Sequence, residues 1–470
     1  MSLQEADWRA ALDEPGPRYL QIVRFVENAI ADGRLRPGDR LPPQRELARA
    51  LGIDLTTVTR AYAEARERNL LHARGALGSF VSAPRFDTAE LLDLGMNLPP
   101  PPLGVDLGEL LRHGFEQVLT HIETHALMSY HPGGGTLADR QAGAAWLTRP
   151  LGKVDPERIV ISPGAQVALS ALLLTLTGPG EPIACEPLIY PGVLSAAHQL
   201  GRRMLPLQAD AEGMLPEALE DAIVQGVRIA YLNPTLRNPT ATTMGAARRD
   251  ALASVASRHG LVFIEDDPYW PLATQAPAPI AARVPDRTYY LSTLSKALTP
   301  GLRTAYVVTP DRDARARFLT SLGALVLMST PVMTSLATQW IHDGTAARIV
   351  DGVRAEASER RRMAVNTLLL DPTVPGEGIH LWLPLPAQWT AQALAMAARV
   401  DGLAVTPSHA FAAEPPATEA IRISLGGIRE RLRLKHSLER LARLLNEAGP
   451  HDDNLRADAE PAAPMPNPPA

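Results

Sequence analysis

Lys296 is the residue whose type and position most strongly indicate chemistry. The chain has 46 lysine and arginine residues, yet its only lysines are Lys153, Lys296 and Lys435. Lys296 follows an apolar segment typical of a buried strand and precedes a Pro-Gly turn. An amine in such a place can lose its proton and form a Schiff base with a carbonyl compound, which a guanidinium group cannot do. The sequence therefore predicts a nucleophilic amine at position 296.

Further polar residues stand where other apolar segments end. Asp266 and Tyr269 follow the segment LVFIE, and Asn238 lies shortly after RIAYL. If these segments are parallel strands, their carboxyl ends meet at the edge of the sheet where ligands bind in open α/β proteins. Pyridoxal phosphate would use this set, because it needs an amine for a Schiff base and a carboxylate that keeps its pyridine nitrogen protonated.

The same region offers donors for a phosphate group. SPGAQVALS, residues 162–170, ends one strand and opens a helix, and the N–H groups at a helix start bind anions. Arg303 can add a bidentate contact, and Thr293 and Ser295 can donate hydroxyl hydrogen bonds. We therefore expect pyridoxal 5'-phosphate as the cofactor. The 12 histidines show no metal-ligand spacing and there is one cysteine, Cys185, so no metal is expected.

These residues need a sheet to position them, and residues 95–447 predict one. Six apolar segments are typical of strands: RIVIS, PIACE, RIAYLN, LVFIED, TYYLSTLS and RTAYVV. Helical patterns separate several of them, which favours a mostly parallel sheet with helices on both faces. Residues 84–94 are expected to form a linker, and residues 448–470, rich in Pro, Ala and Asp, a disordered tail.

Residues 15–83 predict a separate small domain. A helical apolar pattern in YLQIVRFVENAIADG is followed by a short helix that ends at Gly52 and by a third helix that Asp54 can cap. Two short strands around Gly75–Gly78 complete a winged helix-turn-helix. Residues 18–74 contain 11 arginines and 7 acidic residues, a balance of about +4, whereas the whole chain carries −5. A basic module on an acidic body indicates two different partners.

Composition favours a cytoplasmic protein without a membrane partner. The content of 46% hydrophobic and 21% charged residues is ordinary for a soluble globular protein. A single cysteine excludes an internal disulfide framework and fits a reducing compartment. The first residues contain acids and no apolar core, which is unlike a signal peptide, and no apolar run approaches the ~20 residues that cross a bilayer.

With these motifs in place, a family resemblance becomes specific. TLSKALTPGLR, residues 293–303, resembles the S-x-S-K-x-x-x-P-G-x-R segment of fold-type-I aminotransferases. NPT, EDDPY and IRISLGG resemble the other signatures of that family, in the usual order, although Ala241 stands where the family has the glycine of NPTG. The resemblance implies an α/β fold, with a large domain built on a mostly parallel sheet and a small C-terminal α+β domain.

The resemblance also implies a role for each site residue. Lys296 would form the internal aldimine, Asp266 would pair with the pyridine nitrogen, and Arg422 would clamp a substrate carboxylate. The other cofactor contacts would come from Tyr269, Asn238, Tyr190, Gly164, Ala165, Gln166, Thr293, Ser295, Arg303 and, reaching over from the partner subunit of a homodimer, Tyr130. Taken singly, each residue has a simpler explanation, such as a solvated loop lysine, a turn aspartate or a packing tyrosine.

The N-terminal domain has its own match. LPPQRELARALGIDLTTVTRAYAEARERNLL, residues 41–71, resembles the GntR-type DNA-binding domain. The order of the two parts is that of the MocR group, in which a GntR-type winged helix is fused to an aminotransferase-like domain. A double-stranded DNA operator is the expected partner. The candidate contacts are Arg45, Thr56, Thr57, Thr59 and Arg60, with Arg74 and Gly75 in the wing. A solvated helix face is the alternative for each of them.

Two functions fit this combination. The first is a transcriptional regulator whose aminotransferase-like domain senses an amino acid, an amine or a B6 vitamer by aldimine exchange at Lys296. The second is an active aminotransferase with an accessory DNA-binding domain. The N-terminal module favours the first, because a dedicated enzyme gains nothing from it. A domain that has lost its cofactor is disfavoured, because Lys296 and Asp266 both remain.

Overall fold

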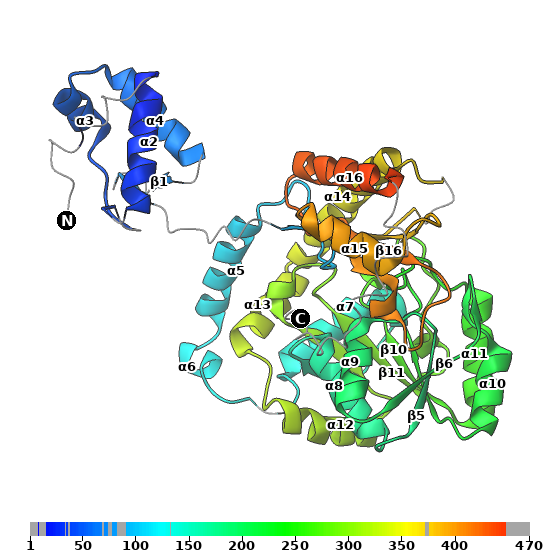
Figure 1. Cartoon of the computed structure of the whole chain (residues 1–470). Coiled ribbons are helices and arrows are strands. Elements are labelled where there is room, and N and C mark those ends of the chain that lie inside the picture. The colour runs from blue at the N-terminus through cyan, green and yellow to red at the C-terminus, as the bar shows by residue number, and fades with distance from the viewer. Residues whose placement is uncertain are drawn as a thin grey trace. The chain divides into compact units, whose positions relative to one another are not determined.

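The chain forms two compact units, residues Met1–Glu90 and Leu91–Ala470. The computed structural model describes residue 8 and residues 16–32, 34–35, 38–67, 70–73, 78–81, 91–131, 133–371 and 376–447 (Figure 1). Residues 91–94, which the sequence assigned to the linker, belong to the second unit, because β3 (Leu92–Asp93) pairs with β14 (Leu403–Ala404). The rest of the predicted linker, residues 84–90, and the predicted tail lie outside the described residues.

The first unit contains the predicted three helices and hairpin. Its elements are α2 (Arg18–Ala31), α3 (Gln44–Leu51), α4 (Leu55–Glu67), β1 (Leu71–Ala73) and β2 (Ser79–Val81). β1 and β2 are antiparallel, with Leu71 opposite Val81. Gly52 ends α3 in the left-handed conformation (φ 64°), which glycine adopts without steric cost.

The core of this unit follows the predicted periodicity. Ile22, Val23 and Val26 of α2 are buried, as are Leu47 of α3 and Val58, Tyr62 and Ala65 of α4. Trp8 is also buried, and its ring packs 5.0 Å from that of Phe25, so the core draws on a residue before the predicted start at residue 15. Each helix therefore contributes one apolar stripe and leaves its other face polar.

The second unit is built on a seven-stranded sheet with the order β4-β12-β11-β10-β9-β5-β6. Its strands are β4 (Ile159–Ser162), β5 (Pro182–Cys185), β6 (Arg203–Pro206), β9 (Ile229–Leu232), β10 (Val262–Asp266), β11 (Thr288–Thr293) and β12 (Ala305–Val308). All pairs are parallel except those of β12, which runs antiparallel to β11 and β4. The six predicted strands are confirmed, and β6 is an addition.

Helices cover both faces of this sheet (Figure 1). On one face, alternate strand residues pack against α8 (Ala165–Leu176), α9 (Pro191–Gln199) and α12 (Arg312–Leu325). The opposite face packs against α10 (Pro216–Val224) and α11 (Ala246–His259) at one end, and against α7 (Leu137–Leu151), α13 (Pro331–His342) and α14 (Thr345–Leu368) at the other. Cys185, the last residue of β5, is fully buried in this core. Two helices precede α7, namely α5 (Leu107–His121) and α6 (Thr124–Leu127).

A smaller sheet follows toward the C-terminus. It has the order β13-β16-β15, with β13 (His380–Pro384), β16 (Ala420–Ser424) and β15 (Thr406–Pro407). α15 (Ala391–Val400) and α16 (Arg431–Asn446) complete this part, which also takes in the long helix α14. This is the predicted small α+β domain. Within the described ranges, no helix is long and apolar enough to cross a membrane.

Candidate functional site

The carboxyl ends of the strands bring the predicted residues to one edge of the large sheet. Asp266 is the last residue of β10, and Lys296 follows the end of β11 by three residues. Asn238 follows β9, and Gly164 lies between β4 and α8. Arg303 precedes β12, whose antiparallel direction places its first residues at the same edge. The topology, rather than closeness in sequence, therefore assembles the site.

Lys296 is poised to act as a neutral amine. Burial, helped by the positive charge of Arg422, lowers the pKa of Lys296 to about 8, while the charge of Asp266 opposes the shift. Its Nζ donates a hydrogen bond to the backbone oxygen of Asn97 (2.7 Å). An amine with this pKa is partly unprotonated near neutral pH and can attack a carbonyl carbon.

Asp266 offers one free carboxylate oxygen. The hydroxyl of Tyr231, in β9, donates to its Oδ2 (2.8 Å), whereas Oδ1 is buried and has no hydrogen-bond partner in the described part of the chain. Burial raises the pKa of Asp266 to about 7, and the Tyr231 hydrogen bond acts in the other direction. A buried carboxylate oxygen without a donor is costly, so Oδ1 fits the N–H of a protonated pyridine ring.

The neighbours of Asp266 in EDDPY have other tasks. Glu265 accepts hydrogen bonds from the backbone N–H groups of Ile280 and Ala281 (2.8 and 2.7 Å). Asp267 accepts one from the hydroxyl of Tyr290 (3.2 Å). Both carboxylates feel the charge of Arg249, a fully buried residue of α11. Of the three carboxylates, Asp266 is the one whose pKa is lowered by the charge of Lys296.

Two asparagines and Arg422 form a second group. The side chain of Asn233 accepts from the backbone N–H of Asn238 (2.8 Å) and donates to the backbone oxygen of Asp266 (2.6 Å). Arg422 Nη1 donates to Asn238 Oδ1 (2.9 Å). Ala241, where the family has glycine, keeps a left-handed backbone (φ 59°). The turn that carries Asn238 is thus preserved without the glycine.

Arg422 is a buried cation without a carboxylate partner among the described residues. Only 6% of the residue is exposed, its Nε has no acceptor, and its Cζ lies 4.9 Å from the centre of the Phe411 ring. Burial lowers the pKa of Arg422. The sequence pattern IRIS allowed an edge strand with a solvated arginine, but β16 is the central strand of its sheet. A buried guanidinium group of this kind fits a ligand carboxylate.

The loop before α8 can cradle a phosphate. Gly164 is the N-cap of α8 and has a φ of 95°, and a Cβ atom there would lie 2.6 Å from Nη2 of Arg303. The N–H groups of the first turn, from Ala165 onward, point out of the helix without intrahelical acceptors. Gln166 Nε2 donates to the backbone oxygen of Gly192 (2.8 Å). The close approach of Arg303 to the helix start concentrates donors for a dianion.

Thr293 and Ser295 lie beside this loop but hydrogen-bond within the protein. Thr293 Oγ1 lies 3.1 Å from Ser295 Oγ and 3.3 Å from the backbone oxygen of Thr304, and both residues are buried. The site as a whole holds the cations Lys296, Arg303 and Arg422 and the carboxylate of Asp266. It is therefore electropositive and suits a phosphate together with a carboxylate.

Sequence reasoning missed a set of contacts around Tyr269. Asn97 Nδ2 donates to the Tyr269 hydroxyl (2.8 Å) and to His380 Nδ1 (3.2 Å), and His380 Nε2 faces the backbone oxygen of Arg237 (3.1 Å). Burial and the charge of Arg422 lower the pKa of His380 to about 3, so the imidazole is neutral. The proton on Nε2 then satisfies the Arg237 carbonyl, and Nδ1 accepts from Asn97.

The two remaining tyrosines differ in exposure. Tyr190, the N-cap of α9, is partly buried, and burial followed by the charge of Asp266 raises its pKa. It therefore lies within electrostatic reach of the cofactor residues. Tyr130 is 74% exposed and is not enclosed by its own chain. No cluster of histidine, cysteine and carboxylate side chains suited to a metal occurs in the described ranges.

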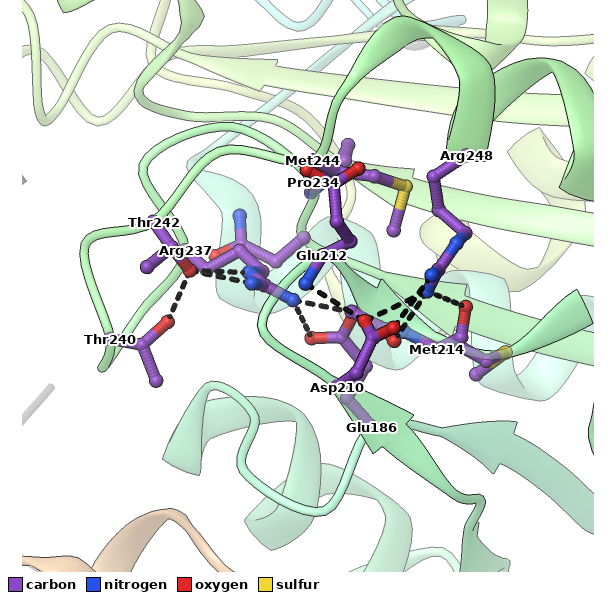
Figure 2. A network of polar contacts seen from close by, with 12 residues as sticks. Glu186, Asp210, Glu212, Met214, Pro234, Arg237, Thr240, Thr242, Met244 and Arg248 are labelled. Atoms are coloured by element: carbon purple, nitrogen blue, oxygen red, sulfur yellow. Dashed lines mark hydrogen bonds and ion pairs between the residues drawn. The ribbon is translucent and has the colours of Figure 1, made fainter.

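A buried ion pair supports the loop before Asn238. Figure 2 shows Arg237 donating to Glu186 (3.2 Å) and to the hydroxyl of Thr242. Arg248 of α11 pairs with Asp210 (2.8 Å) in the same network. Arg237 and Glu186 follow β9 and β5, so their contact ties together the ends of two neighbouring strands. This ion pair therefore stabilises the backbone next to Asn238.

The candidate DNA-binding surface lies on the first unit. Arg45, Thr56, Thr59 and Arg60 are exposed and Thr57 is half-buried. Arg60 stacks on the ring of Tyr19 in α2 (3.9 Å to the ring centre), and Thr59 donates to Gln44 (2.9 Å). Arg74 and Gly75 lie outside the described residues. Asp54 precedes α4 directly, and its backbone oxygen accepts from the N–H of Thr57.

A hollow of about 460 Å³ beside the helix-turn-helix adds two residues that the sequence did not single out. Arg18, at the start of α2, and Arg49, in α3, line it together with Thr57. Asp54 lines the same hollow, so two arginines and one carboxylate border it. Their position could have been inferred only from how the helices pack.

Comparison with protein families assigns the two units to different families. The family model described as "Bacterial regulatory proteins, gntR family" matches residues 18–81, and the model "Aminotransferase class I and II" matches residues 91–441. These matches confirm the predicted domain order, which is that of MocR-type regulators.

Curated relatives share this order over nearly their whole length. The HTH-type transcriptional regulator YdeF of Bacillus subtilis is 29% identical over 456 residues, covering 94% of this chain and 97% of that protein. The vitamin B6 salvage pathway transcriptional repressor PtsJ of Salmonella typhimurium is 26% identical, covering 87% and 94%. The pyridoxine biosynthesis transcriptional regulator PdxR of Corynebacterium glutamicum is 28% identical, covering 77% and 82%.

Solved structures resemble the second unit. A kynurenine aminotransferase of Pyrococcus horikoshii superimposes with a TM-score of 0.69 at 24% identity, covering 77% of this chain and 92% of that one. The α-aminoadipate aminotransferase LysN of Thermus thermophilus gives 0.69 and 24%, covering 76% and 92%. These similarities establish the fold-type-I aminotransferase architecture.

Proposed function

We propose that this chain, which belongs to the aminotransferase class I and II family, is a DNA-binding transcriptional regulator that senses a small molecule through pyridoxal 5'-phosphate. The observation that carries the proposal is the joining of a GntR-type module to an aminotransferase class I and II domain in one chain. The cofactor is that of the family, and it supplies an electrophilic carbon for amines and an electron-withdrawing ring.

The cofactor contacts that we propose are those that the family resemblance implies. Lys296 would form the Schiff base, Asp266 Oδ1 would hold the protonated pyridine nitrogen, and Arg303 would bind the phosphate. The remaining contacts are Gly164, Ala165, Gln166, Thr293 and Ser295 at the phosphate, Tyr269 and Asn238 at the 3-hydroxyl oxygen, and Tyr190 on the ring. The free Oδ1 atom of Asp266 and the approach of Arg303 to Gly164 support this arrangement.

The effector is an amino acid, an amine or a B6 vitamer. A primary amine would displace the Lys296 amine from the cofactor, and a carboxylate on the same molecule would bind the guanidinium group of Arg422, whose Nε has no acceptor in the described part of the chain. The names of PtsJ and PdxR connect those relatives with vitamin B6, which supports a vitamer as one effector class. Among these effectors, an amino acid brings a carboxylate for Arg422, whereas a simple amine or a vitamer does not.

The DNA contacts are proposed on α3, α4 and the wing. Arg45 lies at the start of α3, and the first half of α4 contains Thr56, Thr57, Thr59 and Arg60. Arg74 and Gly75 lie outside the described residues and are proposed from the sequence alone. Exposure of the first turn of α4 supports this surface. The half-buried Thr57 hydroxyl borders the hollow lined by Arg18 and Arg49, so we place a phosphate there.

We propose a cytoplasmic homodimer. The apolar side chains exposed by more than half include Met128 (76%), Tyr130 (74%), Leu119, Leu137 and Leu327, and we propose that these five form one patch. The N–H of His131 donates to Met328 Sδ, which places these segments side by side. Such a patch is typical of a subunit interface, and it would carry Tyr130 to the phosphate of the partner's site.

Transamination is a second candidate. The Lys296 amine, with its pKa of about 8, is suited to moving a proton at the substrate's α-carbon as well as to binding the cofactor. In that case keto acid would appear from an amino acid donor, and DNA binding would be secondary.

The test combines colour and DNA binding. Purified protein is loaded with pyridoxal 5'-phosphate, its visible spectrum is recorded with added amino acids, amines and vitamers, and its affinity is measured for duplexes selected from a random-sequence library. We expect a visible band that Lys296→Ala abolishes, and DNA affinity that falls steeply as salt rises. Arg45→Ala and Thr57→Ala should weaken DNA binding roughly tenfold.

Arg34→Ala serves as the matched control, because Arg34 is exposed in the same module but pairs with Asp32 (3.1 Å). Equal affinity of all variants would contradict the DNA surface. Release of keto acid with turnover, and no effect of any effector on DNA affinity, would favour the aminotransferase instead.

A further inference from the structure

The two ligand-binding cations of the site both hold the backbone of one short segment. Lys296 Nζ donates to the oxygen of Asn97 (2.7 Å), and Arg422 Nη2 donates to the oxygen of Gly95. This segment, residues 91–98, is the point at which the chain enters the second unit. The Lys296 amine and the Arg422 guanidinium group, which we expect to bind a cofactor and a carboxylate, therefore donate here to backbone oxygens of the protein itself.

The segment has further anchors, and one of them shares an acceptor with Arg422, because Thr406 Oγ1 also donates to the Gly95 oxygen (3.1 Å). β3 pairs with β14 over Leu92 and Asp93. The Asp93 carboxylate then accepts from the N–H groups of Gly95 (2.7 Å) and Met96 (2.8 Å), and forms a tight turn. Beyond the turn, Asn97 is held by its side-chain bonds to Tyr269 and His380 and by the lysine. Asn97 Oδ1 is buried without a partner among the described residues. Lys296 therefore holds the Asn97 oxygen, and Arg422 holds the Gly95 oxygen together with Thr406.

We propose that residues 95–97 are a ligand-responsive contact of the site, released in two steps. When Lys296 becomes part of a Schiff base it no longer has the three N–H donors of an ammonium group, so its bond to the Asn97 oxygen is lost or weakened. When a ligand carboxylate binds Arg422, it competes with the Gly95 oxygen for Nη2, and a carboxylate is the stronger acceptor. Binding of the cofactor would thus release the Asn97 oxygen, and binding of a ligand carboxylate would release the Gly95 oxygen from Arg422.

The inference rests on the proposed function in one respect, because release of this segment would carry ligand binding toward the DNA-binding unit. Leu91 follows directly on residues 84–90, the part of the predicted linker that lies outside the described residues. Residues 95–97 are therefore the part of the chain that links the hydrogen bonds of Lys296 and Arg422 to the linker through the fewest residues. Asn97 acts here as a positioning residue, since it touches Lys296 and Tyr269 but supplies no reacting atom.

Hydrogen–deuterium exchange of the full chain tests the proposal directly. Peptides that cover residues 92–98 are compared between the cofactor-free protein and protein loaded with pyridoxal 5'-phosphate. We expect their protection to fall about tenfold on loading, the change that corresponds to one hydrogen bond from a charged donor. Protection at residues 163–168 should rise in the same sample, because the phosphate binds there. The α11 peptide, residues 250–259, should not change.

Two aminooxy probes separate the two carbonyls. Methoxyamine and aminooxyacetate would both replace Lys296 at the cofactor carbon to which its nitrogen is bound. The probe nitrogen forms the new C=N bond and gives up two protons, and the lysine nitrogen leaves with these protons as a free amine. Only aminooxyacetate has a carboxylate for Arg422. Methoxyamine should therefore restore protection around Asn97, whereas aminooxyacetate should leave Gly95 and Met96 exchanging about tenfold faster than methoxyamine does.

Two sets of variants complete the test. Asp93→Ala removes the turn's acceptor and should give the cofactor-free protein the fast exchange of the loaded form, whereas Asp93→Asn keeps an acceptor and should restore most of the protection. Lys296→Ala should exchange fast with or without cofactor. Unchanged or increased protection of residues 92–98 on loading would overturn the proposal.

The same experiments distinguish a failure of the proposed sensing function from a failure of the proposed contact. If exchange changes as expected but neither probe alters DNA affinity, the contact is real and the sensing function is wrong. If the probes alter DNA affinity while residues 92–98 exchange at one rate throughout, sensing stands and this contact does not carry it.

Discussion

Lys296 owes its chemistry to a pKa far below that of a solvated lysine. With a pKa of about 8, about a tenth of the amine is unprotonated at pH 7, against well under a thousandth for an ordinary lysine. We expect the rate of cofactor capture by the cofactor-free protein to rise with pH, with a midpoint near 8. Arg422→Gln should raise this midpoint, because the charge of Arg422 disfavours the lysine cation, and Arg422→Lys should leave it in place. Stopped-flow absorbance gives the profile, and a midpoint above 10 would refute the assignment.

Asp266 and Asp267 form a matched pair for a second prediction. Asp266→Asn keeps an acceptor for Tyr231 but cannot balance a protonated pyridine, so the Kd of pyridoxal 5'-phosphate should rise tenfold to hundredfold, about 1.5–3 kcal/mol. Asp267→Asn should spare cofactor affinity and instead lower stability by about 3 kcal/mol, because the buried charge of Arg249 loses a neighbour. Spectroscopic titration and urea unfolding measure the two effects. An equal loss of affinity in both variants would contradict the division of roles.

At the scale of elements, the start of α8 is set by a glycine that no other residue replaces freely. Gly164→Ala places a Cβ 2.6 Å from Arg303 Nη2, so the guanidinium group must move away from the phosphate cup. Affinity for pyridoxal 5'-phosphate should fall at least tenfold, while affinity for pyridoxal, which lacks the phosphate, should change little.

The control for this variant is Gly152→Ala. Gly152 also has a positive φ (70°), but a Cβ there meets nothing within 4 Å. With ψ at −146°, Gly152 lies in a region that only glycine adopts readily, so the substitution should cost roughly 1–3 kcal/mol of backbone strain and leave both affinities unchanged. If Gly152→Ala weakens cofactor binding as much as Gly164→Ala does, general destabilisation explains the result.

Strands and site motifs could be predicted wherever sequence pattern and local chemistry agree. Lys296, Asp266 and Arg303 stand in short motifs at strand ends, and the topology brings them together as expected. β6 was missed because RMLP is short and begins with an exposed arginine. Asn97, Tyr231 and His380 were missed because their contacts join residues far apart in sequence. A tyrosine inside a strand, such as Tyr231, looks the same as a packing residue until the neighbouring strand is placed.

For the whole molecule, the prediction concerns assembly. Met128→Glu puts a charge beside Tyr130 in the proposed interface and should convert the proposed dimer to a monomer with weaker cofactor binding. Val224→Glu, at a residue 84% exposed on α10, should remain dimeric. Sedimentation at several concentrations distinguishes the species. A Met128→Glu variant that stays dimeric would show that this surface is not the interface.

A mixed assembly tests the contribution of Tyr130 across the interface. Tyr130→Phe and Lys296→Ala chains each have a defect in every site when assembled alone. If Tyr130 serves the partner's phosphate, both defects fall in one site of the mixed dimer, and its other site is intact. Half of the sites should then bind cofactor with the wild-type affinity. A mixture without intact sites would place Tyr130 in its own subunit.

The burial of Cys185 has a practical consequence for following this protein in motion. The thiol sits at the end of β5 with no exposed surface, and burial raises its pKa, so it stays protonated and unreactive toward alkylating dyes. Because Cys185 is the sole cysteine, new cysteines introduced at exposed positions, such as Arg34 in the first unit and Val224 in the second, would be the only sites that dyes label. Fluorophores attached at both would report, molecule by molecule, how far the two units travel when an effector binds.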